Sequence, residues 1–398
     1  MEAYAHHHHH HDDVEVSPAA WSDGKRYAWL LGIIVPLSPF LAWFWVTVTG
    51  LGVLWYLGPA LVFVLFPILD ALVGLDRANP PDSILKFLEQ DRYYRWCTYV
   101  FIPIQYAGLI FACWEWSQGD LSLIESIGLA LTMGVVGGIA INTAHELGHK
   151  RAGSERWLSR VALAQTGYGH FFIEHNRGHH VKVATPEDPA SARLGESFWA
   201  FLPRTVSGSL RSAWEIEGAR LDRLEKPHLS IHNDILTAWA MTIGLFAGLT
   251  LVFGWLVLPY LVAQAVIGFS LLEVVNYLEH YGLLREKKEH GRYQRCLPRH
   301  SWNSNNVASN VLLYHLQRHS DHHANPTRRY QALRHVDEAP QLPTGYAGMI
   351  VLAWFPPLWR RVMDPRLLEH YDGDVGRCNI QPSKREKILA RHGRTAAA

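Results

Sequence analysis

Nine histidines stand in four short groups whose spacing suits metal ligation. The groups are His145-Glu-Leu-Gly-His149, Glu174-His175-Asn-Arg-Gly-His179-His180, Glu279-His280-Tyr-Gly and His319-Ser-Asp-His322-His323. On an α-helix, residues three or four positions apart share a face. We therefore expect each of three helical pairs to direct two imidazoles at one point: His145 with His149, His175 with His179, and His319 with His322 or His323.

Nine imidazoles exceed the four ligands of one tetrahedral zinc ion. Adjacent histidines such as 179 and 180, or 322 and 323, point about 100° apart on a helix, so each such pair could reach two ions. Nine ligands suit two ions of four or five coordination. Imidazole-rich sites suit iron, copper, nickel or zinc, and open redox chemistry favours iron. The pattern predicts a two-metal site without dividing the ligands between the ions.

Ligating imidazoles usually donate their second N–H to a carboxylate or a carbonyl. Five acids close to the groups or to a span end are candidates for that role: Asp70, Glu146, Glu174, Glu279 and Asp321. Asp70 is the most specific of them, because it is an acid at the end of an apolar segment. Its alternative interpretation is an interfacial side chain in contact with water.

The segments that must position these groups are apolar. No Asp, Glu, Lys or Arg occurs in 27–69, 96–114, 126–144 or 235–272, and about 20 apolar residues cross a bilayer. We predict an all-α integral membrane protein whose cytoplasmic helical cap carries a histidine-rich di-metal site. Its six transmembrane helices are expected at about 27–48, 52–74, 96–116, 122–145, 235–257 and 260–282. Buried helices of a large soluble protein are the alternative, but they explain four such windows poorly.

Orientation follows from the distribution of Lys and Arg. The 76–95 connection, the 146–234 segment and the region after 283 carry these residues, whereas the connections near 50, at 117–121 and near 258 carry none. We expect a multi-pass protein of the inner membrane with both termini and the cap in the cytoplasm. The amphipathic segments 154–172 and 346–363 should lie on the membrane surface or cap the bundle.

Other totals set the limits of the domain. The run His6 to His11 is typical of a purification tag, so 1–24 is interpreted as tag and N-terminal tail, 25–371 as one domain, and 372–398 as a loosely held basic tail. A net charge of +1 argues against nucleic-acid binding. Four cysteines without a C-x-x-C pair exclude a cysteine-based zinc, iron–sulfur or rubredoxin site.

Four segments carry a family resemblance: HELGHK (145–150), EHNRGHH (174–180), NYLEHYGL (276–283) and LQRHSDHHANP (316–326). Through them the chain resembles the integral-membrane alkane 1-monooxygenases, which belong with the fatty acid desaturases to a histidine-rich, non-haem di-iron family. The H-x-x-x-H and H-x-x-x-H-H spacings are similar to the hydroxylase branch. The resemblance covers about 25–370.

The resemblance implies two iron ions that the nine histidines hold, and hydroxylation of the terminal methyl of n-alkanes with O₂ to give the primary alcohol. It also implies two protons and two electrons, the electrons delivered singly by rubredoxin, which a rubredoxin reductase reduces. Because this chain has no C-x-x-C pair, a separate rubredoxin, or one fused beyond residue 390 in the native chain, is implied.

Three other functions remain open. A desaturase would share the spans and the ligands but form a C=C bond. H-E-x-x-H at 145–149 also matches the zinc metalloprotease motif, with Glu146 as base, but that reading leaves three groups unexplained. A histidine-rich metal transporter would carry its ligands along its spans.

A stripe of small residues precedes His145 on the fourth span, at Gly134, Gly137, Gly138 and Ile141. We expect this face to line a slot for the alkyl chain, with Trp55 or Phe111 setting the chain length. Close helix packing is the alternative, because small residues are common where membrane helices meet.

Rubredoxins are usually acidic, so five cations near the site are candidates for contact with the electron donor. They are Lys150, Arg151, Arg177, Lys182 and Arg318. The bias of positive charge toward the cytoplasmic side predicts the same residues without any docking role.

Overall fold

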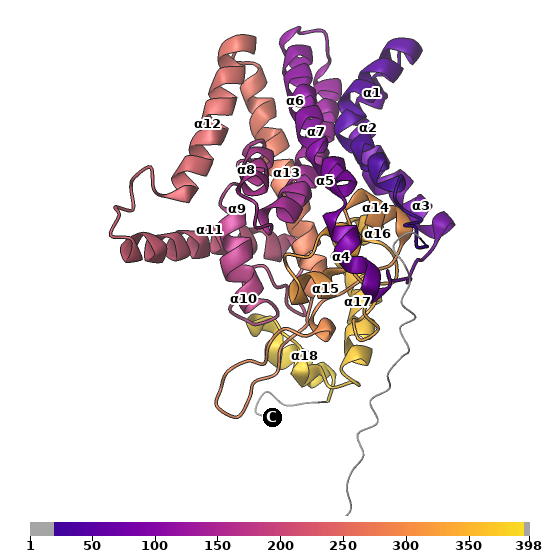
Figure 1. Cartoon of the computed structure of the whole chain (residues 1–398), viewed down its shortest axis with the longest axis vertical. Coiled ribbons are helices and arrows are strands. Elements are labelled where there is room, and N and C mark those ends of the chain that lie inside the picture. Colours follow the sequence, from indigo (N-terminus) through magenta and orange to yellow (C-terminus); the bar gives the residue numbers. More distant parts are fainter. Residues whose placement is uncertain (1–19, 394–398) are drawn as a thin grey trace, which may run out of the picture.

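A computed structural model describes residues 20–393 of the chain. Six helices are long and apolar enough to cross a membrane, and they form a bundle (Figure 1). They run over Ala28–Thr49, Gly52–Val73, Arg92–Ser117, Leu123–Gly148, Asp234–Phe253 and Val257–His280. The predicted all-helical class and the six spans are confirmed, and within the described residues only isolated β-bridges occur.

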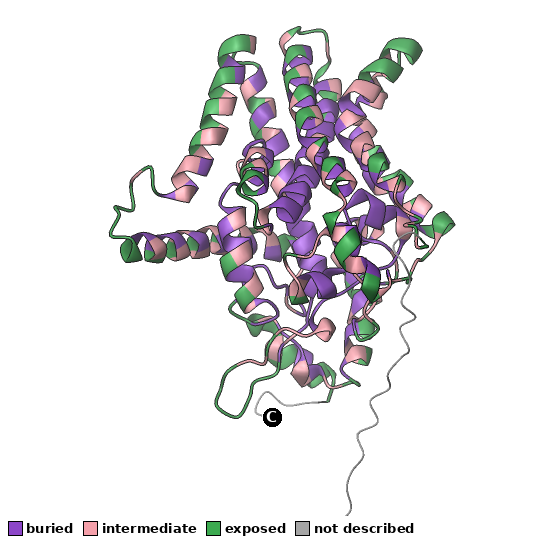
Figure 2. Ribbon diagram, viewed as in Figure 1, coloured by how far each residue is buried: buried purple, intermediate pink, exposed green. Residues whose placement is uncertain are grey.

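Several spans are composite. The first joins η1 (Ala28–Ile33) to α1 (Ile34–Thr49), and the third joins α5 (Arg92–Tyr99) to α6 (Phe101–Ser117). The second contains η2 (Gly52–Tyr56), α2 (Leu57–Ala60), η3 (Leu61–Leu65) and α3 (Phe66–Val73). The others are α7 (Leu123–Gly148), α12 (Asp234–Phe253) and α13 (Val257–His280). Figure 2 shows that α7 lies in the buried centre while α12 is largely exposed along its length.

Most of the remaining elements cover one end of the bundle, where α7 and α13 finish (Figure 1). We call this the histidine end. Its longer helices are α4 (Asp82–Gln90), α8 (Gly153–Ala164), α11 (Phe198–Arg223), α16 (Tyr346–Ala353) and α17 (Pro356–His370). Its shorter ones are α9 (Phe171–Ile173), η4 (Glu174–His179), α10 (His180–Lys182), η5 (Pro298–His300), α14 (Val307–Leu312), α15 (His319–Ala324), η6 (Tyr330–Ala332), η7 (Val375–Arg377), η8 (Pro382–Lys384) and α18 (Arg385–Arg391).

Helix α8 does not lie on the membrane surface but packs along α7 and points back into the bundle. Ser159 Oγ donates to the Ala144 carbonyl at 2.7 Å, and beyond the end of α8 Gln165 Nε2 donates to the Met133 carbonyl at 3.2 Å. Met133 is about three turns further into the span than Ala144. The expected amphipathic helix at 154–172 therefore ends at Ala164, and the chain turns at membrane depth.

The turn after α8 is polar, and its neighbours satisfy it. Gln165 Nε2 also donates to Gln264 Oε1 at 3.0 Å, and Thr242 Oγ1 donates to the Ala164 carbonyl at 2.8 Å. Gln105 of α6 donates to Gln165 Oε1 at 2.9 Å. Irregular backbone inside a membrane is tolerated where protein groups replace water in this way.

Two further expectations for the cap differ from the structure. The expected helix at 346–363 is interrupted between α16 and α17, because Pro356 and Pro357 can begin a helix but cannot continue one. The described part of the basic tail, residues 372–393, packs against the rest of the protein and is not loosely held. Asn379 N donates to the Gly282 carbonyl at 2.9 Å, and Ile388 and Leu389 are buried. The expected tag at 6–11 lies outside the described residues.

Candidate metal centre

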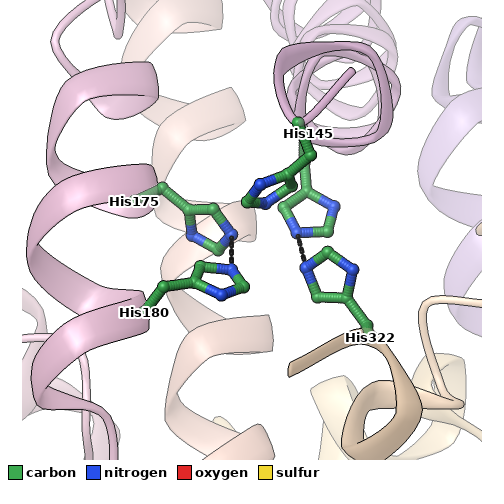
Figure 3. A group of neighbouring side chains, drawn as sticks. His145, His175, His180 and His322 are labelled. Atoms are coloured by element: carbon green, nitrogen blue, oxygen red, sulfur yellow. Dashed lines mark hydrogen bonds between the residues drawn. The ribbon is translucent and has the colours of Figure 1, made fainter. Parts of the chain in front are cut away.

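The nine predicted histidines come together in two groups at the histidine end. A five-histidine group contains His145, His149, His175, His180 and His322, and a four-histidine group contains His179, His280, His319 and His323. In each group the possible ligand atoms all lie within 4.8 Å of one another. Figure 3 shows four imidazoles of the first group facing one another, with Nε2 atoms 2.9 Å apart between His145 and His322 and 3.1 Å apart between His175 and His180.

The second histidine motif pairs differently from the α-helical expectation. We expected His175 and His179 to share a point, but they fall into different groups. The reason is that η4 (Glu174–His179) is a π-helix, whose wider turn places residues five apart on one face. His175 therefore faces His180, and His179 is released to the four-histidine group.

The other spacing expectations agree with the structure. His145 and His149 share one group, and His319 and His323 share the other, with Nε2 atoms 2.9 Å apart. Adjacent histidines divide between the groups at 179 and 180 and again at 322 and 323. The continuous segment formed by η4 and α10 thus contributes to both groups, and so does α15. These two segments hold the groups side by side.

The hydrogen bonds of the four-histidine group fix which ring nitrogen carries the proton. His179 Nδ1 lies 2.7 Å from Asp188 Oδ2, and His280 Nδ1 donates to the His300 carbonyl at 2.8 Å. His319 Nδ1 lies 2.6 Å from Glu279 Oε2, but it forms no hydrogen bond there. A neutral imidazole carries one proton, so Nδ1–H leaves a lone pair on Nε2. The Nε2 lone pairs of His179 and His280 consequently face the interior of this group.

Burial favours the neutral form of His175, His180 and His322. The pKa values of His175, His180 and His322 lie well below the usual value near 6.5. The main cause is burial away from solvent, and repulsion from neighbouring imidazoles adds to it. The Nε2 atoms of His149, His179 and His280 are buried with no hydrogen-bond partner among the described residues. Buried lone pairs without donors are costly unless an ion binds them, so the nitrogen set fits two metal ions.

The sequence found one of the acids that support the imidazoles and missed another. Glu279 was predicted, and it contacts His319. Asp188 was not predicted, although it is buried and contacts His179. Burial opposes ionisation of Asp188, but His179 and hydrogen bonds from Ser191 and Ala190 outweigh it and lower the pKa. Asp188 sits nine residues after His179 in an irregular segment, so no helical spacing signals it.

The other predicted acids do not contact an imidazole in the described residues. Asp70 accepts from the Ser309 backbone at 2.8 Å and so holds the first turn of α14. Glu146 pairs with Lys150 at 3.1 Å, and Asp321 pairs with Arg328 at 2.9 Å. Glu174 is buried at the start of η4, where burial raises its pKa to about 7. Glu146 is therefore not free to act as a protease base, which disfavours the metalloprotease alternative.

The glycine stripe packs against α13 and does not line an open slot. A Cβ on Gly134 would lie 2.4 Å from Ile267 Cγ2, and one on Gly138 would lie 2.7 Å from Leu271 Cδ2. A Cβ on Gly137 would lie 2.8 Å from Thr166 Cγ2. The alternative interpretation, close helix packing, accounts for these glycines.

The remaining channel candidates are scattered. Ile141 packs in a separate apolar cluster with residues of α8, and Phe111 stacks against Phe40 and Trp114 at the side of α6. Trp55 is buried, and its carbonyl accepts from Thr132 Oγ1 at 2.7 Å. Thr132 precedes His145 by 13 residues, which is about 20 Å of helix. Trp55 therefore lies far along the bundle from the histidines and is buried there.

A small apolar cavity is lined by residues that come shortly before three of the histidines in the chain. It is enclosed by α7, α13, α14 and α16, and its lining includes Asn142, Val275 and Leu316. These three residues precede His145, His280 and His319 by three, five and three positions. Gly138, a member of the predicted stripe, also lines this cavity.

Two of the five predicted docking cations are buried. Lys150 is 4% exposed and pairs with Glu146, and Arg318 is 1% exposed and donates to the carbonyls of Leu333 and Asp76. Neither can contact a partner protein. Arg151 and Arg177 are exposed, and Lys182 is partly exposed.

The chain is similar to known proteins over most of its length. A sequence model of the fatty acid desaturase family matches residues 123–382. The alkane 1-monooxygenase of Acinetobacter baylyi is 48% identical over 376 residues, which cover 94% of this chain and 92% of that relative. Alkane 1-monooxygenase 1 of Alcanivorax borkumensis is 47% identical over 92% and 90% of the two chains. The xylene/toluene monooxygenase hydroxylase component of Pseudomonas putida is 27% identical over 69% and 72%.

Proposed function

The chain belongs to the alkane 1-monooxygenase family, and from that premise we propose that it hydroxylates the terminal methyl of n-alkanes with O₂. In the balanced reaction, RCH₃, O₂, two electrons and two protons give RCH₂OH and H₂O. We propose rubredoxin as the donor of the electrons, one per encounter, and two iron ions as the cofactor. Iron would supply the O₂ reduction that no side chain can perform.

One observation carries this proposal: nine imidazoles converge in two adjacent groups at one end of six spans. That arrangement supports two ions in preference to the single ion of a metalloprotease. It also differs from a transport path, because the ligands gather at one end and do not follow the spans.

The residues of the chain contribute orientation and exclusion of water. Asp188 and the His300 carbonyl would hold the Nδ1 protons of His179 and His280, so that Nε2 of each imidazole is available as a ligand. Glu279 lies beside His319 Nδ1 and would orient that ring. We place the reacting methyl in the apolar cavity beside Asn142 and Leu316, where it would contact carbon atoms and no water. Trp55 would then limit chain length from the far end of the bundle.

We further propose an inner-membrane location with the histidine end and both termini in the cytoplasm. The support is the Lys/Arg bias of the connections, since those at the opposite end carry neither residue. Cytoplasmic exposure of this end would give a soluble electron donor access to it.

The decisive experiment combines metal analysis with product analysis. The purified chain should bind two iron ions, and a His322→Ala variant should bind fewer, whereas His228→Ala, which changes an exposed histidine outside both groups, should retain two. Incubation with octane, O₂, rubredoxin and its reductase should give 1-octanol by mass spectrometry. An alkene product would indicate desaturation, and one zinc ion per chain would overturn the proposal.

A further inference from the structure

A basic groove lies between α17 and α18, on the side of the histidine end that faces away from the six spans (Figure 1). Five cations line it: Arg360, Arg361, Lys384, Lys387 and Arg391. All five are exposed, and none forms an ion pair with a carboxylate in residues 20–393. Five cations against one lining carboxylate, Asp364, leave the groove with an excess of positive charge that attracts an acidic partner.

The floor of this groove is apolar and rigid. Leu194, Leu368 and Ile388 line it beside the cations. Ile388 is buried, and the backbone of Leu194 is fixed by hydrogen bonds with Asn379 and Gln381. Apolar side chains next to polar and charged ones are common in protein–protein contacts.

A short connection leads from this groove to the four-histidine group. Asp364, the only carboxylate among the residues that line the groove, accepts a hydrogen bond from Tyr281 Oη at 2.7 Å. Tyr281 follows His280 directly in the chain. Trp359 of α17 is buried against the Tyr281 ring, with centroids 5.3 Å apart. The groove is thus separated from a proposed metal ligand by one side chain and one hydrogen bond.

We propose that this groove is the docking surface of the acidic one-electron carrier protein that reduces the metal centre. The inference rests on the proposed function and locates its electron entry on α17 and α18, away from the cations predicted from the sequence. At each encounter the carrier is oxidised from Fe(II) to Fe(III) and one electron passes to the centre. Two encounters supply the two electrons of one hydroxylation.

The position of the groove favours a soluble protein over a lipid headgroup. It lies beyond Tyr281, where α13 has already ended, and on elements outside all six spans. Charge complementarity at such a surface acts chiefly on the association rate, which falls as salt is added.

The test is a charge reversal with a matched control. Arg361→Glu, Lys387→Glu and Arg391→Glu are combined in the full-length chain, and the control combines Arg77→Glu, Lys86→Glu and Arg92→Glu. Both triples change the net charge by the same amount at exposed positions near the histidine end. Binding of bacterial rubredoxin and its oxidation by the chain are followed by interferometry and stopped-flow absorbance at several ionic strengths.

We expect the groove triple to lower the association rate about tenfold or more at low salt and to flatten its salt dependence, whereas the control changes it less than about twofold. Alcohol formation driven by dithionite should remain normal in both, which shows that fold and metal are intact. Equal losses in the two triples, or no loss in either, would overturn the docking surface. So would a groove triple that lost only its affinity for phosphatidylglycerol vesicles.

The two proposals fail separately. If the unaltered chain forms no alcohol with any donor, the proposed function fails, and rubredoxin binding to the groove is still measured directly. If dithionite supports hydroxylation but the groove triple binds rubredoxin normally, the function stands and the docking surface is wrong.

Discussion

Replacing Asp188 by Asn tests whether the carboxylate beside His179 sets the state of that imidazole. Asp188 Oδ2 lies 2.7 Å from His179 Nδ1 and accepts from Ser191 Oγ at 2.6 Å, while Oδ1 accepts from Ala190 N at 3.1 Å. All three partners can donate, so an amide NH₂ in either orientation meets at least one donor. The least costly adjustment moves the His179 proton from Nδ1 to Nε2 and removes the lone pair that faces the four-histidine group.

The expected magnitude follows from the loss of that support. Changing such an outer partner of a metal ligand typically lowers metal affinity by 10–100-fold, which is about 1.4–2.7 kcal/mol. Iron bound per chain is measured at a series of free iron concentrations set by a chelator, together with the melting temperature of the metal-free protein. We expect weaker binding of one of the two ions and unchanged binding of the other.

Asp321→Asn is the matched control, because Asp321 is also a buried acid next to the histidines but contacts Arg328 and no imidazole. If Asp321→Asn weakens iron binding as much as Asp188→Asn, the effect comes from general loss of negative charge. Full affinity in Asp188→Asn would refute the argument from the tautomer.

Three further outcomes are expected. Glu146→Gln should cost about 3–5 kcal/mol of unfolding free energy, because it leaves the buried Lys150 ammonium without its partner; thermal unfolding measures this. Gly134→Ala should cost about 1–3 kcal/mol and impair alkanes of every length alike, because the new methyl would overlap Ile267. The metal-free protein should lose stability as pH falls below 6.5, where imidazoles such as His175 and His322 take up protons only when unfolded, since burial lowers their folded pKa; melting curves from pH 7.5 to 5.5 test this.

Each of these outcomes has its own control. Replacing both Glu146 and Lys150, by Gln and Met, should recover part of the loss, whereas a protease base would give an inactive but stable Glu146→Gln protein. Gly244→Ala meets no atom within 4 Å and should leave stability nearly unchanged. A melting temperature independent of pH would contradict the neutral state of the imidazoles.

The spans and the nine histidines were predictable from the sequence because both follow simple patterns. A run without charges marks an apolar span whatever its neighbours, and H-x-x-x-H marks a shared face as long as the segment is α-helical. The prediction that His175 and His179 share one point was wrong, because the π-helical turn of η4 depends on packing that residue spacing does not encode. Asp188, which reaches His179 through an irregular turn, was also not predicted.

The burial of individual charged side chains was also not predictable from the sequence. Lys150 and Arg318 look like surface cations in the sequence, but each is enclosed by segments distant in the chain and satisfied by Glu146 or by backbone carbonyls. The glycine stripe had two interpretations that composition could not separate. The structure shows close packing at these glycines, against Ile267 and Leu271 of α13 and against Thr166, which the composition of the stripe does not reveal.

The polar turn that follows α8 has a consequence for the order of events during synthesis. The groups that satisfy it at membrane depth include Thr242 and Gln264, which lie 78 and 99 residues later than their partners. At about 5–20 residues per second, a ribosome needs roughly 5–20 s to add those 99 residues. During that interval the turn after α8 lacks its hydrogen-bond partners on α12 and α13, so α8 stays outside the bilayer. The histidine end can therefore close only after α13 has left the translocation machinery, and a ribosome that stops before α13 yields a chain with no metal centre.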